Sequence, residues 1–552
     1  MADEQRISTR AFFVSSLGIS INNLYFCRKK EDSMETTFVK YPIGVQNFER
    51  IRREDYTYVD KTAMVWQLAN QGSYYFLNRP RRFGKSLLIS TLEAYFEGKR
   101  ELFEGLAISR MEKEWKKYPV LHLDLNAKQY NNREALLKIL NMHLERWEQC
   151  YGSDYRDRDV DERFAWIIRR AYEQTGSPVV ILVDEYDKPM AMNLNNEPLQ
   201  DEYCSILKAF YGVMKSSDRY IRLGFLTGVT KFSKVSVFSD LNNLRDISML
   251  PDYITICGLT EQEIRDNFDG AVGQLAEARH LTKEECYAEL RRRYDGYHFC
   301  EDSVGIYNPF SVLNTLASRR FGDYWFETGT PTQLIELLKS TDYNLNDLLE
   351  GEVSAQLLGS VDSIKQDPVS VFYQSGYLTI KGYDEEFAEY TLGFPNDEVR
   401  EGFIKFLLPL YTNQNRDNTQ FAISRFVREV RSGQPEAFMT RLAAMMADTD
   451  YRIVGNSELY FQNFLFVFFR LLGLYVEVER ATSDGRTDMV VQTKDYVYIM
   501  EFKLDKTADE ALRQIEQKSY ALPFATDPRR LYKLGINFNS QQRRVDEWKI
   551  VE

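Results

Sequence analysis

Two stretches of the sequence carry residue types suited to phosphate chemistry, and the first lies near the N-terminus. An apolar, aromatic run from Tyr74 gives way to basic residues, and Gly84, Lys85 and Ser86 then open a segment with apolar residues at helical spacing. Backbone N–H groups at a helix N-terminus bind phosphate oxygens, the lysine reaches the outer phosphates, and the serine hydroxyl can join a Mg²⁺ shell. Arg79 stands where the motif G-x-x-x-x-G-K-[ST] has its first glycine. Only the second half of the motif matches, so these residues alone also suit a strand followed by a basic turn that binds no phosphate.

An acidic pair follows a continuous apolar run at residues 178–183, which is typical of a strand buried on both faces of a parallel sheet. At the carboxyl end of such a strand, beside a phosphate loop, Asp184 can hold Mg²⁺ and Glu185 can accept a proton from the attacking water. The alternative is a solvated turn. The strand expected next ends at Thr227, which, with Thr230, is a candidate for contact with a γ-phosphate. The acidic pair and the loop support each other as parts of one site.

The second stretch lies near the C-terminus, where residues 496–504 alternate so that Glu501 and Lys503 share one face of a strand. Asp488 lies on the neighbouring strand of the same hairpin, and Gln514 lies on the helix that follows. Two carboxylates can hold a Mg²⁺ ion, and a lysine can orient or activate water beside a phosphate. The alternative is an ion pair at a strand edge, because alternating charged strands produce the pattern E-x-K often.

The elements that must position the first site alternate between strands and helices. The apolar runs predict strands from Tyr74 and at residues 119–125, 178–183, 221–226 and 253–257, and helices from Lys85 and at residues 133–149 and 162–174. A short strand from Thr57 and an amphipathic helix precede them. This alternation predicts an α/β fold with a parallel, doubly wound sheet that binds its ligand at the carboxyl ends of the strands.

The chain length suggests about three domains at ~100 to 200 residues each. We expect residues 1–33 to be an extension with little structural role. Residues 34–270 should form the phosphate-loop domain, residues 271–435 a mostly helical lid or linker, and residues 436–552 a C-terminal α/β domain.

Composition limits the classes of function. The net charge of −12 argues against a protein coated with nucleic-acid-binding surface, although a local basic groove remains compatible with it. The six cysteines form no C-x-x-C pair, so neither a zinc site nor a disulfide framework is indicated, and we expect free thiols in the reducing cytoplasm. Polar residues interrupt the apolar stretch at 459–476, which predicts a buried helix and no membrane span.

Several further segments carry a family resemblance. They are RPRRFGKSL, ILVDEYD, YDGYHF, YNPFS, YQSGYLTI, FPNDEVR and the ending GRTDMVV, IMEFKL and ALRQIEQKSYA. Together they resemble the AAA-ATPase-like family that carries a C-terminal PD-(D/E)XK nuclease-superfamily domain and is common in gut Bacteroidetes. The resemblance runs from about Thr37 to the C-terminus, and the family's loop also carries RPRRFGK in place of a glycine-first motif.

The resemblance implies a P-loop NTPase sheet, a restriction-endonuclease-like C-terminal domain, and ATP and Mg²⁺ as cofactors. The residues implied in nucleotide binding are Arg79, Pro80, Arg81, Arg82, Phe83, Gly84, Lys85, Ser86 and Thr227. Those implied in metal binding are Ser86, Asp184, Asp488 and Glu501. Those implied in catalysis are Glu185, Asp488, Glu501, Lys503 and Gln514.

The leading hypothesis is a protein that binds and hydrolyses ATP and is coupled to a Mg²⁺-dependent nuclease acting on DNA or RNA, with DNA preferred. The alternative is a nucleotide-regulated switch, or a module that binds nucleic acid or protein through an inactive nuclease fold. Equal numbers of acidic and basic residues in residues 451–552 favour this alternative over tight DNA binding. A third hypothesis is a loop that binds nucleotide with negligible turnover. Assembly as a homo-oligomer is expected by analogy only.

Overall fold

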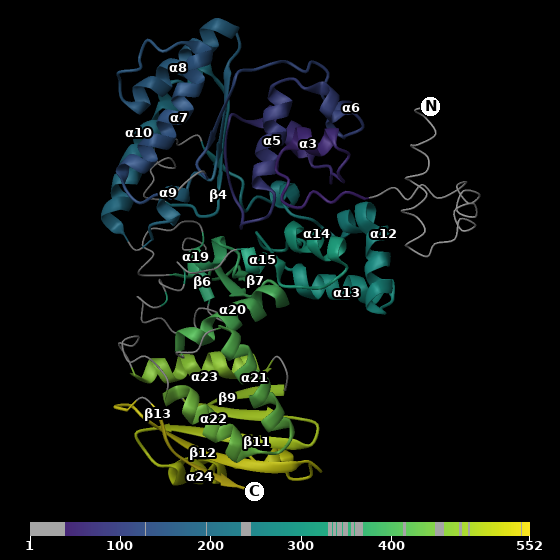
Figure 1. Ribbon diagram of the computed structural model, residues 1–552, viewed down its shortest axis with the longest axis vertical. Helices are drawn as coiled ribbons and strands as arrows, with labels where there is room; N and C mark the ends of the chain where they lie inside the picture. Colours follow the sequence, from purple (N-terminus) through teal and green to yellow (C-terminus); the bar gives the residue numbers. More distant parts are fainter. Residues whose placement is uncertain are drawn as a thin grey trace, which may run out of the picture.

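Three β-sheets follow one another along the long axis of the molecule (Figure 1). The computed structural model describes residues 39–126, 129–194, 196–232, 244–328, 334, 338, 345, 352–354, 358, 368–411, 416–447, 457–473, 477–483, 486–542 and 544–552. The expected N-terminal extension, residues 1–33, lies outside the described residues. No helix in the described part of the chain has the length and apolar character needed to cross a membrane.

The first sheet is parallel and has the strand order β2-β3-β4-β1-β5. Its strands are β1 (Tyr74–Asn78), β2 (Val120–Asp124), β3 (Val179–Asp184), β4 (Ile221–Gly228) and β5 (Arg245–Asp246). The first four lie where the apolar runs predict them. Every residue of β3 is buried, as expected for a strand covered on both faces.

The predicted fifth strand at residues 253–257 is wrong. The 3₁₀-helix η3 (Pro251–Ile256) occupies this stretch, and β5 forms the edge of the sheet. Pro251 lacks a backbone N–H group for strand pairing and fits the first position of a helical turn. The three-residue spacing of Tyr253 and Ile256 then buries both side chains on one side of a 3₁₀ turn.

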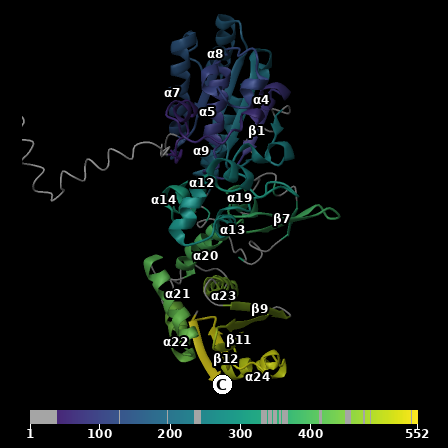
Figure 2. The ribbon, with the colours of Figure 1, turned by 90° about the vertical axis from the view of Figure 1, so that its right-hand side faces the viewer.

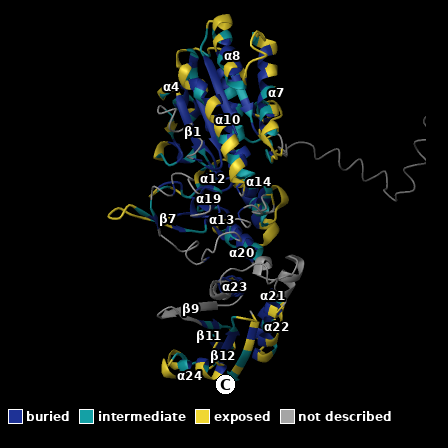
Figure 3. Ribbon diagram, turned by 90° about the vertical axis from the view of Figure 1, so that its left-hand side faces the viewer, coloured by how far each residue is buried: buried dark blue, intermediate teal, exposed yellow. Residues whose placement is uncertain are grey.

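Helices cover both faces of this sheet, which confirms the predicted doubly wound fold. Figure 1 shows α7, α8 and α10 on one side of the strands and α3 and α5 on the other, and Figure 3 shows their outer faces exposed while the strands between them are buried. The helices of this part are α3 (Phe48–Arg53), α4 (Thr62–Gln71), α5 (Lys85–Phe96), η1 (Arg100–Phe103), α6 (Ile108–Met111), α7 (Arg133–Tyr151), α8 (Val160–Thr175), α9 (Lys188–Ala191), α10 (Glu197–Ser216) and η2 (Asp218–Tyr220). The predicted short strand at Thr57 is replaced by a single bridge between Lys40 and Tyr56.

The middle region is predominantly helical, as predicted, but it also contains a small antiparallel sheet with the strand order β6-β8-β7. Its elements are α12 (Glu261–Arg279), α13 (Lys283–Tyr294), α14 (Pro309–Ser318), α15 (Tyr324–Thr328), β6 (Glu352–Ser354), α19 (Val369–Gln374), β7 (Thr379–Asp384), β8 (Glu389–Gly393), α20 (Asp397–Tyr411) and α21 (Arg416–Arg431). The β7–β8 hairpin projects from the side of the molecule (Figure 2). These strands were not predicted from the sequence, although Ile380 in β7 and Tyr390 and Thr391 in β8 are residue types favoured in strands.

The C-terminal part is a mixed sheet with the strand order β13-β12-β11-β10-β9. Its elements are α22 (Pro435–Ala447), α23 (Ser457–Gly473), β9 (Glu477–Ser483), β10 (Arg486–Gln492), β11 (Tyr496–Leu504), α24 (Ala508–Gln517), η5 (Leu522–Phe524), β12 (Arg530–Asn539) and β13 (Arg544–Val551). Strands β11 and β12 are parallel and α24 connects them, while the other pairs are antiparallel. The predicted α/β arrangement of this domain is confirmed.

One buried carboxylate joins three segments of the middle region. Glu398 lies in the first turn of α20 and is 1% exposed. One carboxylate oxygen accepts a hydrogen bond from the backbone N–H of Trp325 (2.7 Å), and the other accepts one from the hydroxyl of Ser311 (2.7 Å). Burial, helped by the negative charge of Asp323, raises the pKa of Glu398 to about 8.

The raised pKa of Glu398 predicts a pH-dependent stability. Because the pKa of about 8 in the folded chain exceeds the ordinary value of 4.5, the folded chain binds this proton more tightly, and stability should fall as the pH rises between these values. Glu398→Gln resembles the protonated side chain, so the variant should lose this dependence. We expect the variant to become more stable than the wild type at higher pH, by roughly a few kcal/mol at pH ~8. Urea unfolding of both proteins from pH ~5 to ~8 checks this, and parallel pH profiles would contradict it.

Candidate functional site

The loop between β1 and α5 has a backbone that turns sharply before the helix begins at Lys85. Arg82 and Gly84 both have left-handed backbone conformations, with φ of +66° and +99°. Such a conformation strains a residue with a Cβ atom by ~1–2 kcal/mol and suits glycine. The loop therefore points the first N–H groups of the 12-residue helix α5 toward the carboxyl end of the sheet.

A cavity of about 350 Å³ lies at this helix N-terminus and is strongly cationic. Its charged lining residues are Arg81, Arg82, Lys85, Lys188 and Glu185, and its polar lining includes Ser86 and Asn126. Four cations and one anion, together with the positive end of a helix dipole, suit a polyphosphate. Of the predicted nucleotide-binding residues, Arg81, Arg82, Gly84, Lys85 and Ser86 line this cavity.

Lys85 is held at the floor of the cavity by the loop itself. Its Nζ atom donates hydrogen bonds to the carbonyl oxygens of Arg79 (3.0 Å) and Pro80 (3.2 Å), and it lies 4.0 Å from a carboxylate oxygen of Glu185. The side chain is 4% exposed. The carbonyls are neutral and the Glu185 carboxylate lies at the outer limit of an ion pair, so a phosphate anion entering the cavity would be a stronger partner for this buried ammonium group.

Asp184 has the surroundings of a Mg²⁺ ligand. It is buried and hydrogen-bonded to the hydroxyl of Ser86, and its Oδ1 atom has no hydrogen-bond partner among the described residues. Burial, with the neighbouring charge of Glu185, raises the pKa of Asp184. A buried carboxylate oxygen without a partner costs free energy, and a hard cation shared with the serine oxygen would relieve that cost. The residues present therefore fit Mg²⁺.

Asp124 is a carboxylate near this site that sequence reasoning missed. It ends β2 and pairs in register with Asp184 at the end of β3. Its charge contributes to the raised pKa of Asp184. The predicted strand at residues 119–125 contained the signal, because an acid at the carboxyl end of a strand beside β3 must lie at the same edge of the sheet.

Arg79 has a different place from the one predicted for it. It is 1% exposed, and its guanidinium group donates to the carbonyl oxygens of Asn78 (2.9 Å), Ser248 (2.7 Å) and Tyr253 (3.3 Å). It also stacks over the ring of Phe299, 4.0 Å from the centroid. The guanidinium group therefore braces the loop from the protein interior, and the predicted nucleotide contact by Arg79 is corrected to this supporting role.

Other predicted residues also pack behind the loop. Phe83 makes edge contacts with the rings of Tyr297 (4.8 Å between centroids) and Phe299 (5.8 Å). Pro80 lies so close to Gly376 that a Cβ atom there would meet it at 2.6 Å. These contacts fasten the loop to the middle region.

Thr227 and Asp187 stabilise the carboxyl end of β4, which pairs with the end of β1 just before the loop. The hydroxyl of Thr227 donates to the carbonyl of Leu77 (2.8 Å) and is buried, so a phosphate contact through the same proton would require this bond to break. Asp187 accepts hydrogen bonds from the backbone N–H groups of Val229 (3.1 Å) and Thr230 (2.6 Å), and burial raises its pKa to about 6. Sequence reasoning did not single out Asp187, although it belongs to the same acidic segment.

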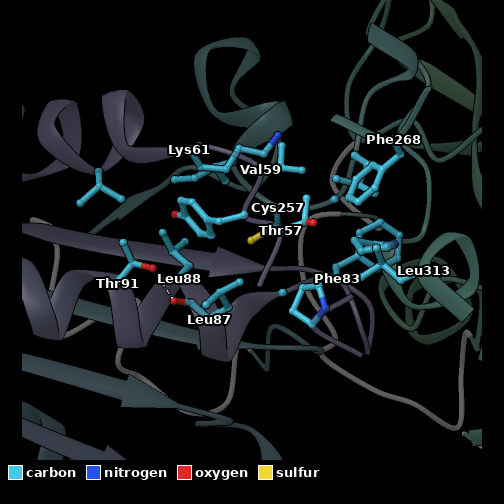
Figure 4. A pocket seen from close by; sticks show the side chains of 18 residues that line it. Thr57, Val59, Lys61, Phe83, Leu87, Leu88, Thr91, Cys257, Phe268 and Leu313 are labelled. Atoms are coloured by element: carbon cyan, nitrogen blue, oxygen red, sulfur yellow. Dashed lines mark hydrogen bonds between the residues drawn. The ribbon is translucent and has the colours of Figure 1, made fainter. Parts of the chain in front are cut away.

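A second, apolar pocket of about 110 Å³ adjoins the cationic cavity, and the two share Pro42, Gly84, Leu87, Pro309 and Leu313. Figure 4 shows Val59, Leu88 and Cys257 among the side chains around it. Its walls come from the segment before α4, from α5 and from the start of the middle region. An apolar slot beside a cationic cavity suits a ligand that combines a flat ring with phosphates.

Three predicted residues of the C-terminal site, Glu501, Lys503 and Gln514, lie together where β11 packs against α24. Glu501 is fully buried, and Nζ of Lys503 donates to Glu501 (2.5 Å) and to the side-chain oxygen of Gln514 (2.6 Å). Oε2 of Glu501 is buried and has no hydrogen-bond partner among the described residues. Asp488 pairs with Glu501 in register across β10 and β11, although its side chain lies outside the described part of the structure. An unpaired, buried carboxylate oxygen again fits a divalent cation.

Substitutions of Arg79 and Arg81 distinguish an arginine that supports the loop from one that contacts the bound phosphate. Arg79→Gln should lower the free energy of unfolding by roughly 2–4 kcal/mol, because buried carbonyls lose a charged donor. Arg81→Gln should leave stability unchanged and weaken nucleotide binding by about tenfold, since its side chain lines the open cavity. Urea unfolding and titration calorimetry measure the two effects. Equal loss of stability in both variants would contradict the assignment.

Comparisons with known proteins match two separate parts of the chain. Residues 42–238 match the family described as predicted AAA-ATPase, and residues 456–548 match the PD-(D/E)XK nuclease superfamily. A protein of Azotobacter chroococcum mcd 1, named "Uncharacterized protein in vnfD 5'region", is 35% identical over 515 residues, which are 92% of this chain and 98% of the relative. The chain therefore belongs to the AAA-ATPase-like family that carries a C-terminal PD-(D/E)XK nuclease-superfamily domain, as the sequence resemblance predicted.

Proposed function

We propose that the protein binds and hydrolyses ATP at the β1–α5 loop and cuts nucleic acid, DNA in preference to RNA, at the β10–β11 site. One observation carries the proposal. Each site holds a buried carboxylate, Asp184 or Glu501, that has an oxygen without a hydrogen-bond partner among the described residues, and each lies near a lysine. This combination suits chemistry on phosphates.

At the first site, the N–H groups of α5 and the ammonium group of Lys85 hold the phosphates of ATP, and the apolar pocket holds the base. Ser86 and Asp184 would hold Mg²⁺, which supplies charge neutralisation at the phosphoryl oxygens when bound. Glu185 orients the attacking water and takes its proton as the water oxygen bonds to the γ-phosphorus. The bond between that phosphorus and the bridging oxygen breaks, and ADP leaves with the negative charge on that oxygen. Glu185 lines the cavity and has a left-handed backbone (φ +55°), and its carboxylate lies 4.0 Å from Nζ of Lys85.

At the second site, Glu501 and Asp488 would hold Mg²⁺, which makes water a stronger nucleophile when bound. Lys503 orients the water beside the phosphodiester, and Gln514 fixes the lysine by accepting one of its protons. The water oxygen bonds to phosphorus and the water releases a proton to solvent, while the bond to one sugar oxygen breaks and that oxygen leaves with a proton from solvent. Three buried free thiols, Cys257, Cys286 and Cys300, support a reducing, cytoplasmic location for this activity. Self-association stays a prediction.

The nuclease assignment predicts the behaviour of two lysine variants. Lys503→Ala should lower the rate of DNA cleavage by about 100-fold or more, because the water loses its orienting group. Lys549→Ala is the matched control, since Lys549 forms an exposed ion pair with Asp509 in the same domain. Plasmid cleavage with Mg²⁺ measures both rates. Wild-type binding of DNA without cleavage in either Mg²⁺ or Mn²⁺ would instead favour the switch with an inactive nuclease fold.

The ATPase assignment predicts different losses for two variants of the first site. Lys85→Ala should abolish tight ATP binding, whereas Glu185→Gln should keep binding and slow phosphate release by about 100-fold or more. Lys99→Ala is the control, because Lys99 pairs with Glu49 and Glu97 away from the cavity. Calorimetry and a phosphate-release assay separate the two steps. Equal phosphate release by Glu185→Gln and the wild type would contradict the role of Glu185.

A further inference from the structure

The short helix α15 contacts the phosphate loop with one of its residues. Nε1 of Trp325 donates a hydrogen bond to the carbonyl oxygen of Arg81 (3.0 Å), and the tryptophan side chain is 5% exposed. Thr328, at the end of the same helix, lines the cationic cavity. Two residues of α15 therefore meet the site at which the phosphates of ATP are proposed to bind.

The other side of α15 is fastened to α20. The backbone N–H of Trp325 donates to Glu398 in the first turn of α20. Phe326 lies directly on Gly402, where an added Cβ atom would be 2.5 Å from the phenylalanine ring. The close approach needs a glycine at this position, because any larger side chain would push the two helices apart. The N-terminus of α20 is further held by an ion pair between Arg292 and Asp397.

From α20 the contacts continue to the nuclease strand. Helix α20 packs against α23, which stands above the C-terminal sheet (Figure 1). Phe469 of α23 contacts the ring of Phe502 of β11, with the centroids 5.8 Å apart. Phe502 lies between Glu501 and Lys503 in the sequence and points to the opposite face of the strand. A shift of α23 would therefore displace the segment of β11 that carries Glu501 and Lys503.

The loop has a physical reason to move when ATP binds. Lys85 donates to the carbonyls of Arg79 and Pro80, the two residues before Arg81. Phosphate oxygens are stronger acceptors for an ammonium group than neutral carbonyls, so bound ATP competes for these same protons. The carbonyls of Arg79 and Pro80, released in this way, are adjacent in the chain to the Arg81 carbonyl that accepts the hydrogen bond of Trp325.

We propose that α15 transmits the occupancy of the phosphate loop to the nuclease site, through Trp325 on one side and Glu398 and Gly402 of α20 on the other. The proposal rests on the proposed ATPase and nuclease activities and adds the element that couples them. Coupling between two binding sites is reciprocal, so DNA should change the affinity for ATP by the same factor by which ATP changes the affinity for DNA. Coupling free energies commonly correspond to about 5- to 150-fold.

The test removes one hydrogen bond and leaves both sites in place. Trp325→Phe keeps an aromatic ring and deletes the donor to Arg81. Its ATP affinity and its cleavage rate without ATP should stay within about twofold of the wild type, while the effect of ATP on cleavage, and of DNA on ATP affinity, should fall to about onefold. Trp548→Phe is the matched control, because it deletes an indole donor to Glu436 within the nuclease domain and should keep full coupling.

A second variant and a second measurement guard against a folding defect in Trp325→Phe. Phe326→Ala removes the contact with Gly402 and should also uncouple the sites. Hydrogen exchange of residues 397–411 should change on ATP addition in the wild type and stay constant in both variants. If both variants keep the ATP effect on cleavage, the role of α15 is wrong. If the wild type shows ATP hydrolysis and DNA cleavage that are independent of each other, the coupling is wrong while both proposed activities stand.

Discussion

The parallel register of β2, β3, β4 and β1 is the constraint on which the first site depends. It brings Asp124, Asp184 and the loop after Asn78 to one edge of the sheet, although they are distant in the sequence. Asp124, Asp184 and Lys85 are partly or fully buried at this edge, and burial makes a charge costly unless a partner is supplied. The loop carbonyls supply part of that partnership for Lys85, and Ser86 supplies part for Asp184. The interactions that these partners leave unsatisfied are available to a phosphate ligand and its metal ion.

Aromatic side chains contribute to the contacts between the parts of the molecule, in a sequence with 35 tyrosines and 35 phenylalanines. Phe83 and Tyr297 join the phosphate loop to the middle region, and Trp325 and Tyr377 pack together beside α20 with their centroids 5.2 Å apart. Aromatic residues suit such joints because they bury a large apolar area and, in tyrosine and tryptophan, keep a polar group for a specific bond. The indole N–H of Trp325 uses this property directly.

The sequence predicted the elements whose signals are local. The loop around Lys85, the buried strand before Asp184 and the hairpin that carries Glu501 all have short patterns with a physical meaning, and the structure has these elements where they were expected. The C-terminal register was also readable, since the alternation in β11 places Glu501 and Lys503 on one face.

Features that depend on contacts between distant residues were not predictable in this way. The place of Arg79 depends on Ser248 and Tyr253, about 170 residues away, and no local pattern records that contact. The 3₁₀-helix at residues 251–256 replaced a predicted strand because Pro251 and the burial of Tyr253 outweighed β propensity. The position of α15 between loop and α20 likewise follows from tertiary packing.

In the proposed mechanism, ATP bound at the β1–α5 loop controls cleavage of nucleic acid at β11. The most direct test titrates ATP and a non-hydrolysable analogue into a plasmid cleavage reaction with Mg²⁺, beside a calorimetric measurement of the Kd for each nucleotide in the same buffer. We expect the cleavage rate to change with a midpoint equal to the measured Kd, and we expect no change in Lys85→Ala. A cleavage rate that is constant across the titration, in a protein that demonstrably binds ATP, would contradict it.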